Sequence, residues 1–397
     1  MSELSRRQAL KIFAALGAGG AAAPLLSACG SGNEPSAATE LAPVKIGLVV
    51  PQSGTFKAIG DDLANGFQLY LDTHEGRLGD RSVKLVTIDE GETAESGRAA
   101  AERLIKQEKV LALSGVASSA TMSAVRDLVE NSQIPLVGSN ASPTTLQGVR
   151  YIWRTSYIND EPAKALGGYA AQKLGSRDSV AVIAPDHQAG HDEVRGFLDA
   201  YGGPVEGQPI YTPFPPPSST NLQPQLNTIK NSGARAVFCF YSGAQAVEFV
   251  KQYRQVGLTQ DLYAPGFMTE GVMLRQEGDA ARGIYTSMNY SPDLDNEANR
   301  RFASAYQQQY SAVPTTYAMA SYDAAFVLDK AIKVAGADPT PQTVNLALGK
   351  IGTIDSPRGA WQFNQNRTPL QKWYLRQVRP DGGVLSNTVL SQLSTLG

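Results

Sequence analysis

The 397-residue chain is predicted to be an α/β protein containing two doubly wound parallel-sheet lobes. Three observations lead to this prediction. The chain is longer than the roughly 250–300 residues over which a single hydrophobic core usually grows. Short apolar runs alternate with segments of helical periodicity, as in parallel sheets that helices cover on both faces. The alternation pauses at residues 151–157 and then starts again, so we expect two α/β sets.

The first set occupies the residues before that pause. Apolar runs predict buried parallel strands at 44–51, 83–88, 110–114 and 134–137. Helices are expected between them, at 94–107 and wherever apolar residues recur at helical spacing. Two such groups are Leu63, Phe67, Tyr70 and Leu71, and Met122, Val125 and Val129. This strand–helix order implies right-handed crossovers within one sheet.

The second set begins after the pause. Strands are predicted at 179–184 and 236–240, and each is followed by a helix with apolar side chains on one face. Further helices are expected around 302–310 and 317–334. The end of the chain, 359–391, contains two strand-like runs on either side of an Asp-Gly-Gly turn signal.

Residues 1–28 are predicted to be an export signal rather than part of the fold. The paired Arg6 and Arg7 precede an uncharged apolar run at 12–26, which is typical of the twin-arginine route, with the general secretory route as the alternative. A retained membrane anchor is the other interpretation. The run is short for a membrane-spanning helix and contains glycine and proline, which favours an export signal that is cleaved off.

The sequence Leu26-Ser27-Ala28-Cys29 resembles the cleavage site of bacterial lipoproteins. Cys29 would then become the first mature residue and carry acyl chains, whose burial in lipid provides the anchor. Residues 29–43 are rich in small residues and proline, as in a flexible tether. We therefore expect a folded body from residue 44, lipid-anchored to the extracytoplasmic face of a membrane, either periplasmic or at the cell surface.

Composition and missing motifs exclude several classes of function. A formal net charge of −2 provides no basic surface for nucleic acid, and two cysteines cannot build a disulfide scaffold. The chain contains no nucleophile elbow, phosphate-binding loop or zinc-protease helix, so we expect neither an enzyme nor a cofactor. His187 and His191 could share a metal, but no acidic or cysteine cluster adjoins them, and a place at the rim of a pocket is favoured. Cys239 lies in an apolar strand and is expected to be buried.

Hydroxyl groups and small residues follow three predicted strands of the first set. They occur at 51–60, 115–121 and 138–143. Because the carboxyl ends of parallel strands meet at one edge of a sheet, these loops are expected to lie together where such sheets bind ligands. Hydroxyls and backbone N–H groups at helix starts suit an anion, particularly a carboxylate. The alternative is ordinary helix capping by Ser119 and Ser142.

A series of short motifs follows a specific order along residues 44–391. They are Val44–Pro51 with Ser53-Gly54, Leu104-Ile105 before Lys109-Val110, Gly115 with Ser118-Ser119, Tyr151 to Thr155, Gly190 after Gln188, Tyr317 to Asp323, and Phe363-Asn364. In this order they resemble the leucine/isoleucine/valine-binding family of type I periplasmic binding proteins. The resemblance implies two lobes joined by three crossovers, with a ligand held between the lobes. It places lobe 1 at 44–155 and 288–360, and lobe 2 at 156–287 and 361–397.

The resemblance also implies a set of ligand-binding residues. Ser119 and Ser142, with their backbone N–H groups, would bind the ligand's carboxylate. The carbonyl near Asn140 and the Ser142 hydroxyl would meet an ammonium group. The full set is Ser53, Phe56, Ile59, Ser119, Asn140, Ala141, Ser142, Tyr157, Gln188, Ala189, Ser242 and Met268.

The second lobe departs from the pattern of amino-acid binders. Ala189 stands where an aromatic residue usually covers the ligand, residues 265–269 lack the acid that meets the ammonium, and Asn159 replaces an aspartate. A buried ammonium without an acidic partner is costly. We therefore expect the carboxylate end to be kept and the ligand to be a branched-chain amino acid-like molecule or a bulkier apolar or aromatic acid. The apolar candidates, which could instead belong to the core, are Phe56, Tyr157, Tyr241, Phe267 and Met268.

Together these features predict a lipid-anchored solute-binding protein of an ABC importer. Its partners would be a small carboxylated ligand and a membrane permease, and it is expected to act as a monomer. The alternative is a ligand-sensing receptor domain that acts in trans on a membrane signalling protein. An exported enzyme is disfavoured because no base is paired with Ser119 or Ser142.

Overall fold

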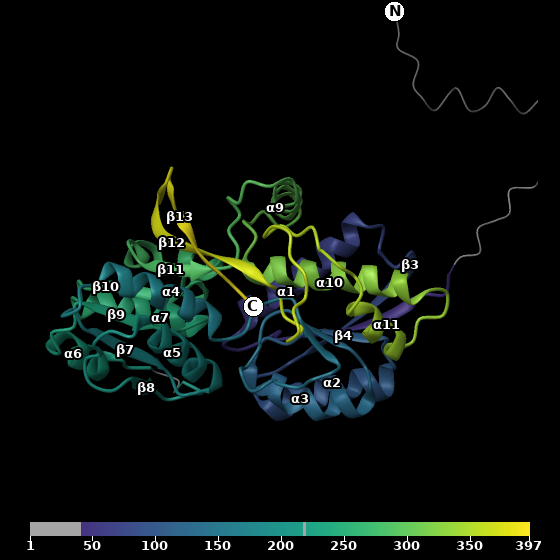
Figure 1. Cartoon of the computed structure of the whole chain (residues 1–397), viewed down its shortest axis with the longest axis horizontal. Helices are drawn as coiled ribbons and strands as arrows, with labels where there is room; N and C mark the ends of the chain where they lie inside the picture. Colours follow the sequence, from purple (N-terminus) through teal and green to yellow (C-terminus); the bar gives the residue numbers. More distant parts are fainter. Residues whose placement is uncertain (1–40, 217–219) are drawn as a thin grey trace, which may run out of the picture. The chain divides into compact units, whose positions relative to one another are not determined.

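The computed structural model describes residues 41–216 and 220–397, which form two α/β sheets with covering helices (Figure 1). The predicted fold class is confirmed. Cys29 and the predicted export signal lie outside the described residues. Within the described ranges, no helix is both long enough and apolar enough to cross a membrane.

The first sheet has six strands in the order β2-β3-β1-β4-β5-β6. All its pairs are parallel except the β2–β3 hairpin. Six of the seven residues of β1 are buried, as expected for a central strand covered on both faces. The strands are β1 (Val44–Val50), β2 (Arg77–Leu78), β3 (Arg81–Asp89), β4 (Ala112–Gly115), β5 (Leu136–Gly138) and β6 (Ile152–Arg154). The predicted pause at 151–157 therefore begins with a strand, β6.

Helices from both ends of the chain cover this first sheet. Early helices are α1 (Lys57–Thr73), α2 (Ala94–Arg103), which continues as a π-turn over Leu104–Glu108, and α3 (Ser119–Ser132). The late helices α10 (Thr316–Ala335) and α11 (Pro341–Leu348) return to it, and α10 packs along α1. The contact is close because Gly66 has no side chain: a Cβ there would lie 2.0 Å from the carbonyl oxygen of Ala318.

The second sheet has seven strands in the order β13-β12-β11-β10-β9-β7-β8. Its strands are β7 (Val180–Pro185), β8 (Ile210–Thr212), β9 (Ala236–Cys239), β10 (Asp261–Pro265), β11 (Tyr285–Met288), β12 (Gln371–Asp381) and β13 (Val384–Leu396). The last two form an antiparallel hairpin beside β11, and the other strands are parallel. The associated helices are α4 (Glu161–Lys173), α5 (Gln188–Tyr201), α6 (Gln223–Asn231), α7 (Ala244–Gln255) and α8 (Val272–Glu277), and α9 (Glu297–Tyr310) follows β11. Cys239 is buried in β9, as predicted.

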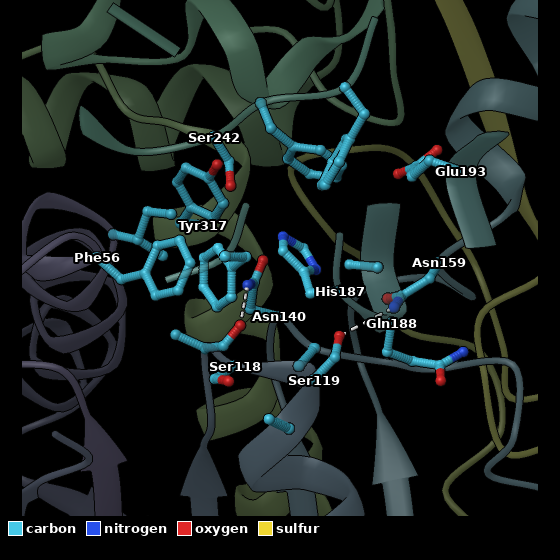
Figure 2. Close-up of a pocket in the computed structure, with 18 of the residues that line it drawn as sticks. Phe56, Ser118, Ser119, Asn140, Asn159, His187, Gln188, Glu193, Ser242 and Tyr317 are labelled. Atoms are coloured by element: carbon cyan, nitrogen blue, oxygen red, sulfur yellow. Dashed lines mark hydrogen bonds between the residues drawn. The ribbon is translucent and has the colours of Figure 1, made fainter. Parts of the chain in front are cut away.

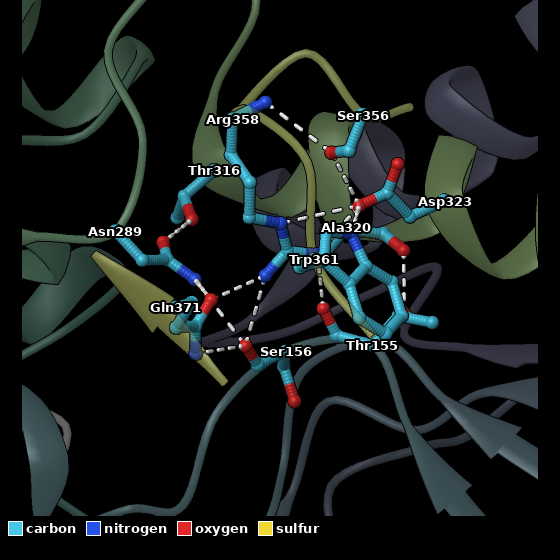
Figure 3. Close-up of polar contacts among 10 residues, drawn as sticks. All are labelled: Thr155, Ser156, Asn289, Thr316, Ala320, Asp323, Ser356, Arg358, Trp361 and Gln371. Carbon is cyan, nitrogen blue, oxygen red and sulfur yellow. Dashed lines mark hydrogen bonds and ion pairs between the residues drawn. The ribbon is translucent and has the colours of Figure 1, made fainter. Parts of the chain in front are cut away.

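Three chain crossovers link the two sheets, and a buried polar network joins them (Figure 3). They follow β6, follow β11 and precede β12. The carbonyl oxygen of Ser156 in the first crossover accepts bonds from Asn289 of the second (3.2 Å) and from Arg358 (3.2 Å) and Gln371 (2.8 Å) of the third. Arg358 also forms a buried ion pair of 2.6 Å with Asp323 on α10. The three crossovers are thus tied at one carbonyl group, while the exact lobe limits stay a prediction.

Candidate ligand-binding site

A cavity of about 80 Å³ lies where loops from the carboxyl ends of both sheets meet (Figure 2). Loops after β1, β4, β5 and β6 contribute from the first sheet, and loops after β7, β8, β9 and β10 contribute from the second. Residues of the two sets approach each other here because the ends of parallel strands gather at one edge of each sheet. The cavity combines one polar end with aromatic walls.

The polar end is formed by the start of α3. Ser118 occupies the N-cap position without making a side-chain capping bond, and Ser119 and Ala120 line the cavity. The backbone N–H groups of Ala117 and Ser118 donate to the buried carboxyl of Glu90, at 2.7 and 2.8 Å. The N–H groups of the next turn have no partner within the helix, as at any helix start. With the positive end of the helix dipole, they suit an anion.

Two asparagines connect this end to the neighbouring loops. Asn140 donates a hydrogen bond from Nδ2 to the carbonyl of Ala117 (2.8 Å). Its Oδ1 accepts a hydrogen bond from the Tyr157 hydroxyl (3.0 Å). Asn159 donates from Nδ2 to the hydroxyl oxygen of Ser119 (3.0 Å), as Figure 2 shows. The polar groups are therefore held in defined orientations.

Aromatic rings form the remaining walls. The ring of Phe267 lies 5.2 Å from that of Tyr157 and 6.1 Å from that of Tyr317. The ring of Phe214 lies 4.4 Å from His187 and 6.3 Å from Phe56. Rings at these separations pack favourably and leave flat surfaces. Such walls suit an apolar or aromatic ligand.

Burial favours the uncharged form of the ionisable side chains that line the cavity. Burial lowers the pKa of His187 to about 4, so its imidazole is neutral. Burial raises the pKa of Glu193 well above its ordinary value, although a backbone bond from Ala163 lowers it in part. Burial also raises the pKa of Tyr157 and Tyr317. Among the lining residues, burial thus disfavours a negative charge on Glu193 facing the positive end of α3.

Comparisons with known proteins identify the family to which this fold belongs. The family described as Periplasmic binding protein matches residues 43–383. The chain belongs to this family. One relative, the Leu/Ile/Val-binding protein homolog 6 of Brucella melitensis, is 27% identical over 365 residues, which cover 89% of this chain and 92% of the relative. The predicted family resemblance is thus confirmed.

Several solved structures are similar to the chain over 88–89% of its length. An ABC transporter solute-binding protein from R. palustris in complex with benzoate is 28% identical, with a TM-score of 0.82 and coverage of 89% of this chain and 97% of the other. A second, from Rhodopseudomonas palustris HaA2 in complex with p-hydroxybenzoic acid, is 27% identical, with a TM-score of 0.83 and coverage of 89% and 98%. A leucine-binding protein from Thermotoga maritima shares the fold at 22% identity, with a TM-score of 0.79 and coverage of 88% and 98%.

Nine of the twelve predicted ligand-binding residues line the cavity of this family member. They are Phe56, Ile59, Ser119, Asn140, Ala141, Tyr157, Gln188, Ala189 and Ser242. The other three lie elsewhere. Ser53 is exposed and donates to Asp89, Ser142 is completely buried, and Met268 is buried with its sulfur 3.9 Å from that of Cys239. Their ligand contacts, like those of the nine, stay a prediction.

Ten cavity residues were not in the predicted set. They are Ala117, Ser118, Ala120, Asn159, His187, Glu193, Phe214, Phe240, Phe267 and Tyr317. Several of them could have been found from the sequence, because they adjoin the ends of predicted strands. Phe267 was already among the apolar candidates. Phe214 follows β8, a strand of only three residues that was not predicted, and Tyr317 comes from the first turn of α10. No local pattern marks these two for the site. In the described part of the chain, no group of three or more His, Cys, Asp or Glu residues could hold a metal ion.

Proposed function

We propose that the protein is the lipid-anchored solute-binding component of an ABC importer and that it binds a small aromatic carboxylate, such as benzoate or a hydroxybenzoate. One observation carries this proposal: the aromatic walls of the cavity end at the start of α3. A ring would lie between the aromatic side chains, and its carboxylate would face the N–H groups and the Ser119 hydroxyl. Benzoate and p-hydroxybenzoate are bound by two of the similar solute-binding proteins.

An amino acid is a poorer fit because its ammonium would lack an ionised partner. Glu193 is the one carboxyl group among the described lining residues, and burial raises its pKa and so favours its uncharged form. The nearby Glu270 is already engaged: it pairs with Arg376 at 2.8 Å and accepts the backbone N–H of Thr316 at 2.9 Å. Burying an ammonium without a counter-charge costs several kcal/mol.

The size of the cavity favours a ligand with a single ring. Its volume of about 80 Å³ is below the ~150 Å³ of an engineered cavity that takes benzene. A benzoate would require a small outward movement of the walls, which two lobes joined by crossovers can provide by hinge motion. Peptides and oligosaccharides are too large.

The proposal is tested by ligand binding to the mature chain, which lacks residues 1–28. Thermal shift and calorimetry should detect benzoate and 4-hydroxybenzoate and give no response to leucine. Ser119→Ala removes a hydrogen bond to a charged group, worth ~1.5–3 kcal/mol, so benzoate affinity should fall by about ten- to a hundredfold. Ser132→Ala, at the other end of α3, is the matched control and should leave affinity unchanged. A response to leucine but not to aromatic acids would refute the proposed ligand class.

A further inference from the structure

Asn159 lines the cavity beside Ser119 and is 3% exposed. Its side chain has three polar neighbours. Oδ1 accepts the backbone N–H of Ser142 at 3.0 Å and Nδ2 donates to Asp192 Oδ2 at 3.4 Å. Nδ2 also donates to Ser119 Oγ at 3.0 Å (Figure 2). All hydrogens of this amide group are therefore used inside the protein.

Two of these neighbours determine which way the amide points. The backbone N–H of Ser142 can only donate, so it must face the amide oxygen. The carboxylate of Asp192 accepts, so it must face the amide nitrogen. Rotating the amide of Asn159 by 180° would place its nitrogen against the donating N–H of Ser142 and its oxygen against the accepting carboxylate of Asp192. The orientation is thus set by hydrogen-bond chemistry.

Asp192 acts as an acceptor because donors surround its carboxylate. It is fully buried, and its Oδ1 accepts from the Thr144 hydroxyl (2.7 Å), Gln188 Nε2 (3.0 Å) and Arg195 Nη2 (2.8 Å). The backbone N–H of Thr144 donates to Oδ2 at 3.2 Å. Because Thr144, Gln188 and Arg195 all donate to this carboxyl group, it faces Asn159 as an acceptor. Asp192 therefore holds Asn159 with its nitrogen toward the site.

This orientation decides what the Ser119 hydroxyl can offer a ligand. Ser119 Oγ receives a hydrogen from Asn159, so its own proton cannot point back along that bond. Across residues 41–216 and 220–397, the Ser119 hydroxyl makes no other hydrogen bond. Its proton is consequently available to the cavity.

We propose that Asn159 is a positioning residue that commits the Ser119 hydroxyl to donate into the cavity, so that the site selects a carboxylate over the corresponding carboxamide. The inference rests on the proposed function and deepens it. The start of α3 offers N–H donors beside the same hydroxyl, so both oxygens of a carboxylate meet donors. The NH₂ group of a carboxamide would face one of those donors with another donor.

An aspartate at position 159 would reverse this polarity. Its second oxygen would face both Asp192 Oδ2 and Ser119, and the Ser119 hydroxyl would turn back and donate to it. Ser119 would present a lone pair to the cavity, which suits an NH₂ group. Asn159→Asp therefore changes hydrogen-bond direction while it keeps the side-chain shape and the acceptor for the Ser142 N–H.

The test compares the affinities of benzoate and benzamide for the mature protein. Wild type should prefer benzoate, and Asn159→Asp should lower the benzoate-to-benzamide affinity ratio by about tenfold or more, the scale expected for a charge-assisted hydrogen bond. The same substitution in a Ser119→Ala background should lower the ratio much less, because the hydroxyl that it acts through is gone. Lowering the pH should partly restore the benzoate-to-benzamide affinity ratio of Asn159→Asp. Once protonated, the introduced carboxyl group can donate a hydrogen bond to the Ser119 hydroxyl oxygen, as the amide of Asn159 does.

Ser242→Asp provides the charge control. Ser242 lines the same cavity from the loop after β9, and among the described residues it makes no hydrogen bond to Ser119, Asn159 or Asp192, so its effect on the ratio should be the same with and without Ser119→Ala. An equal effect of Asn159→Asp in both backgrounds, or an unchanged ratio, would overturn the inference alone. Failure of wild type to bind benzoate would overturn the proposed function and the inference together.

If Asn159→Asp does not fold, a crystal structure of wild type with benzoate decides. Support requires a carboxylate oxygen within hydrogen-bond distance of Ser119 Oγ, with Asn159 Nδ2 still on that hydroxyl. A benzoate whose carboxylate contacts other groups would overturn the inference.

Discussion

Replacing Arg358 with methionine should destabilise the protein without touching the ligand cavity. Asp323 is fully buried, and its Oδ2 accepts from Nε and Nη2 of Arg358, from the Ser356 hydroxyl and from the Trp361 indole, as Figure 3 shows. Its Oδ1 has no hydrogen-bond partner among the described residues. Burial raises the pKa of Asp323, and Arg358 opposes that shift. Methionine would leave the carboxyl group buried without its counter-charge.

The size of the effect follows from the burial of both partners. Their side chains are 2% and 0% exposed, and removing one member of such a pair costs ~3–5 kcal/mol. Unfolding entropy of ~2.1 cal/mol/K per residue amounts to roughly 0.75 kcal/mol/K for residues 41–397. The melting temperature should therefore fall by about 4–7 °C.

Differential scanning calorimetry of the chain without residues 1–28 measures this shift. Arg301→Met is the matched control, because Arg301 is 63% exposed and its ion pair with Glu297 should contribute less than about 1 kcal/mol. Adding Asp323→Asn to Arg358→Met should recover part of the loss, because a neutral group then remains in the core. A melting temperature for Arg358→Met within 1 °C of wild type would refute the reasoning.

Three further outcomes are expected. Burial raises the pKa of Glu161 from 4.5 to about 8, so wild type should lose stability as the pH rises from 4.5 to 8. In denaturant titrations, Glu161→Gln should make this loss of stability with pH less steep. An unchanged pH dependence would contradict the role of Glu161. Gly66→Ala should lower the melting temperature, because its Cβ would collide with the Ala318 carbonyl, whereas Gly168→Ala, in open space on α4, should be neutral or slightly stabilising. Cys29→Ser should move the protein from the membrane fraction to the soluble fraction, and retention at the membrane would count against a lipid anchor.

Two parallel sheets could be predicted because several of their strands are strongly apolar. The runs around β1, β7 and β9 are bounded by turns and alternate with amphipathic helices. Five strands were missed, β2, β6, β8, β10 and β11, and each has only two to five residues. So few residues carry little periodicity, and pairing with a neighbouring strand decides their conformation.

Cavity residues could be anticipated where strand order alone brings loops together. Ser119 and Asn140 follow adjacent parallel strands, so their proximity was foreseeable. Ser142 and Met268 also lie near strand ends, but both are fully buried away from the cavity wall. Which side of a loop faces the ligand depends on the packing of both lobes, which local sequence does not encode.

The sequence by itself determined the α/β class, the family and the loops that surround the cavity, because these depend on residue periodicity and on the shared edge of parallel strands. Only the tertiary structure decided the polarity of the site. Asn159 and Asp192 are brought together from the first crossover and α5, and their bonding sets the direction of the Ser119 hydroxyl. Hydrogen-bond direction depends on which donors and acceptors meet in space, and here the partners come from separate elements of the fold.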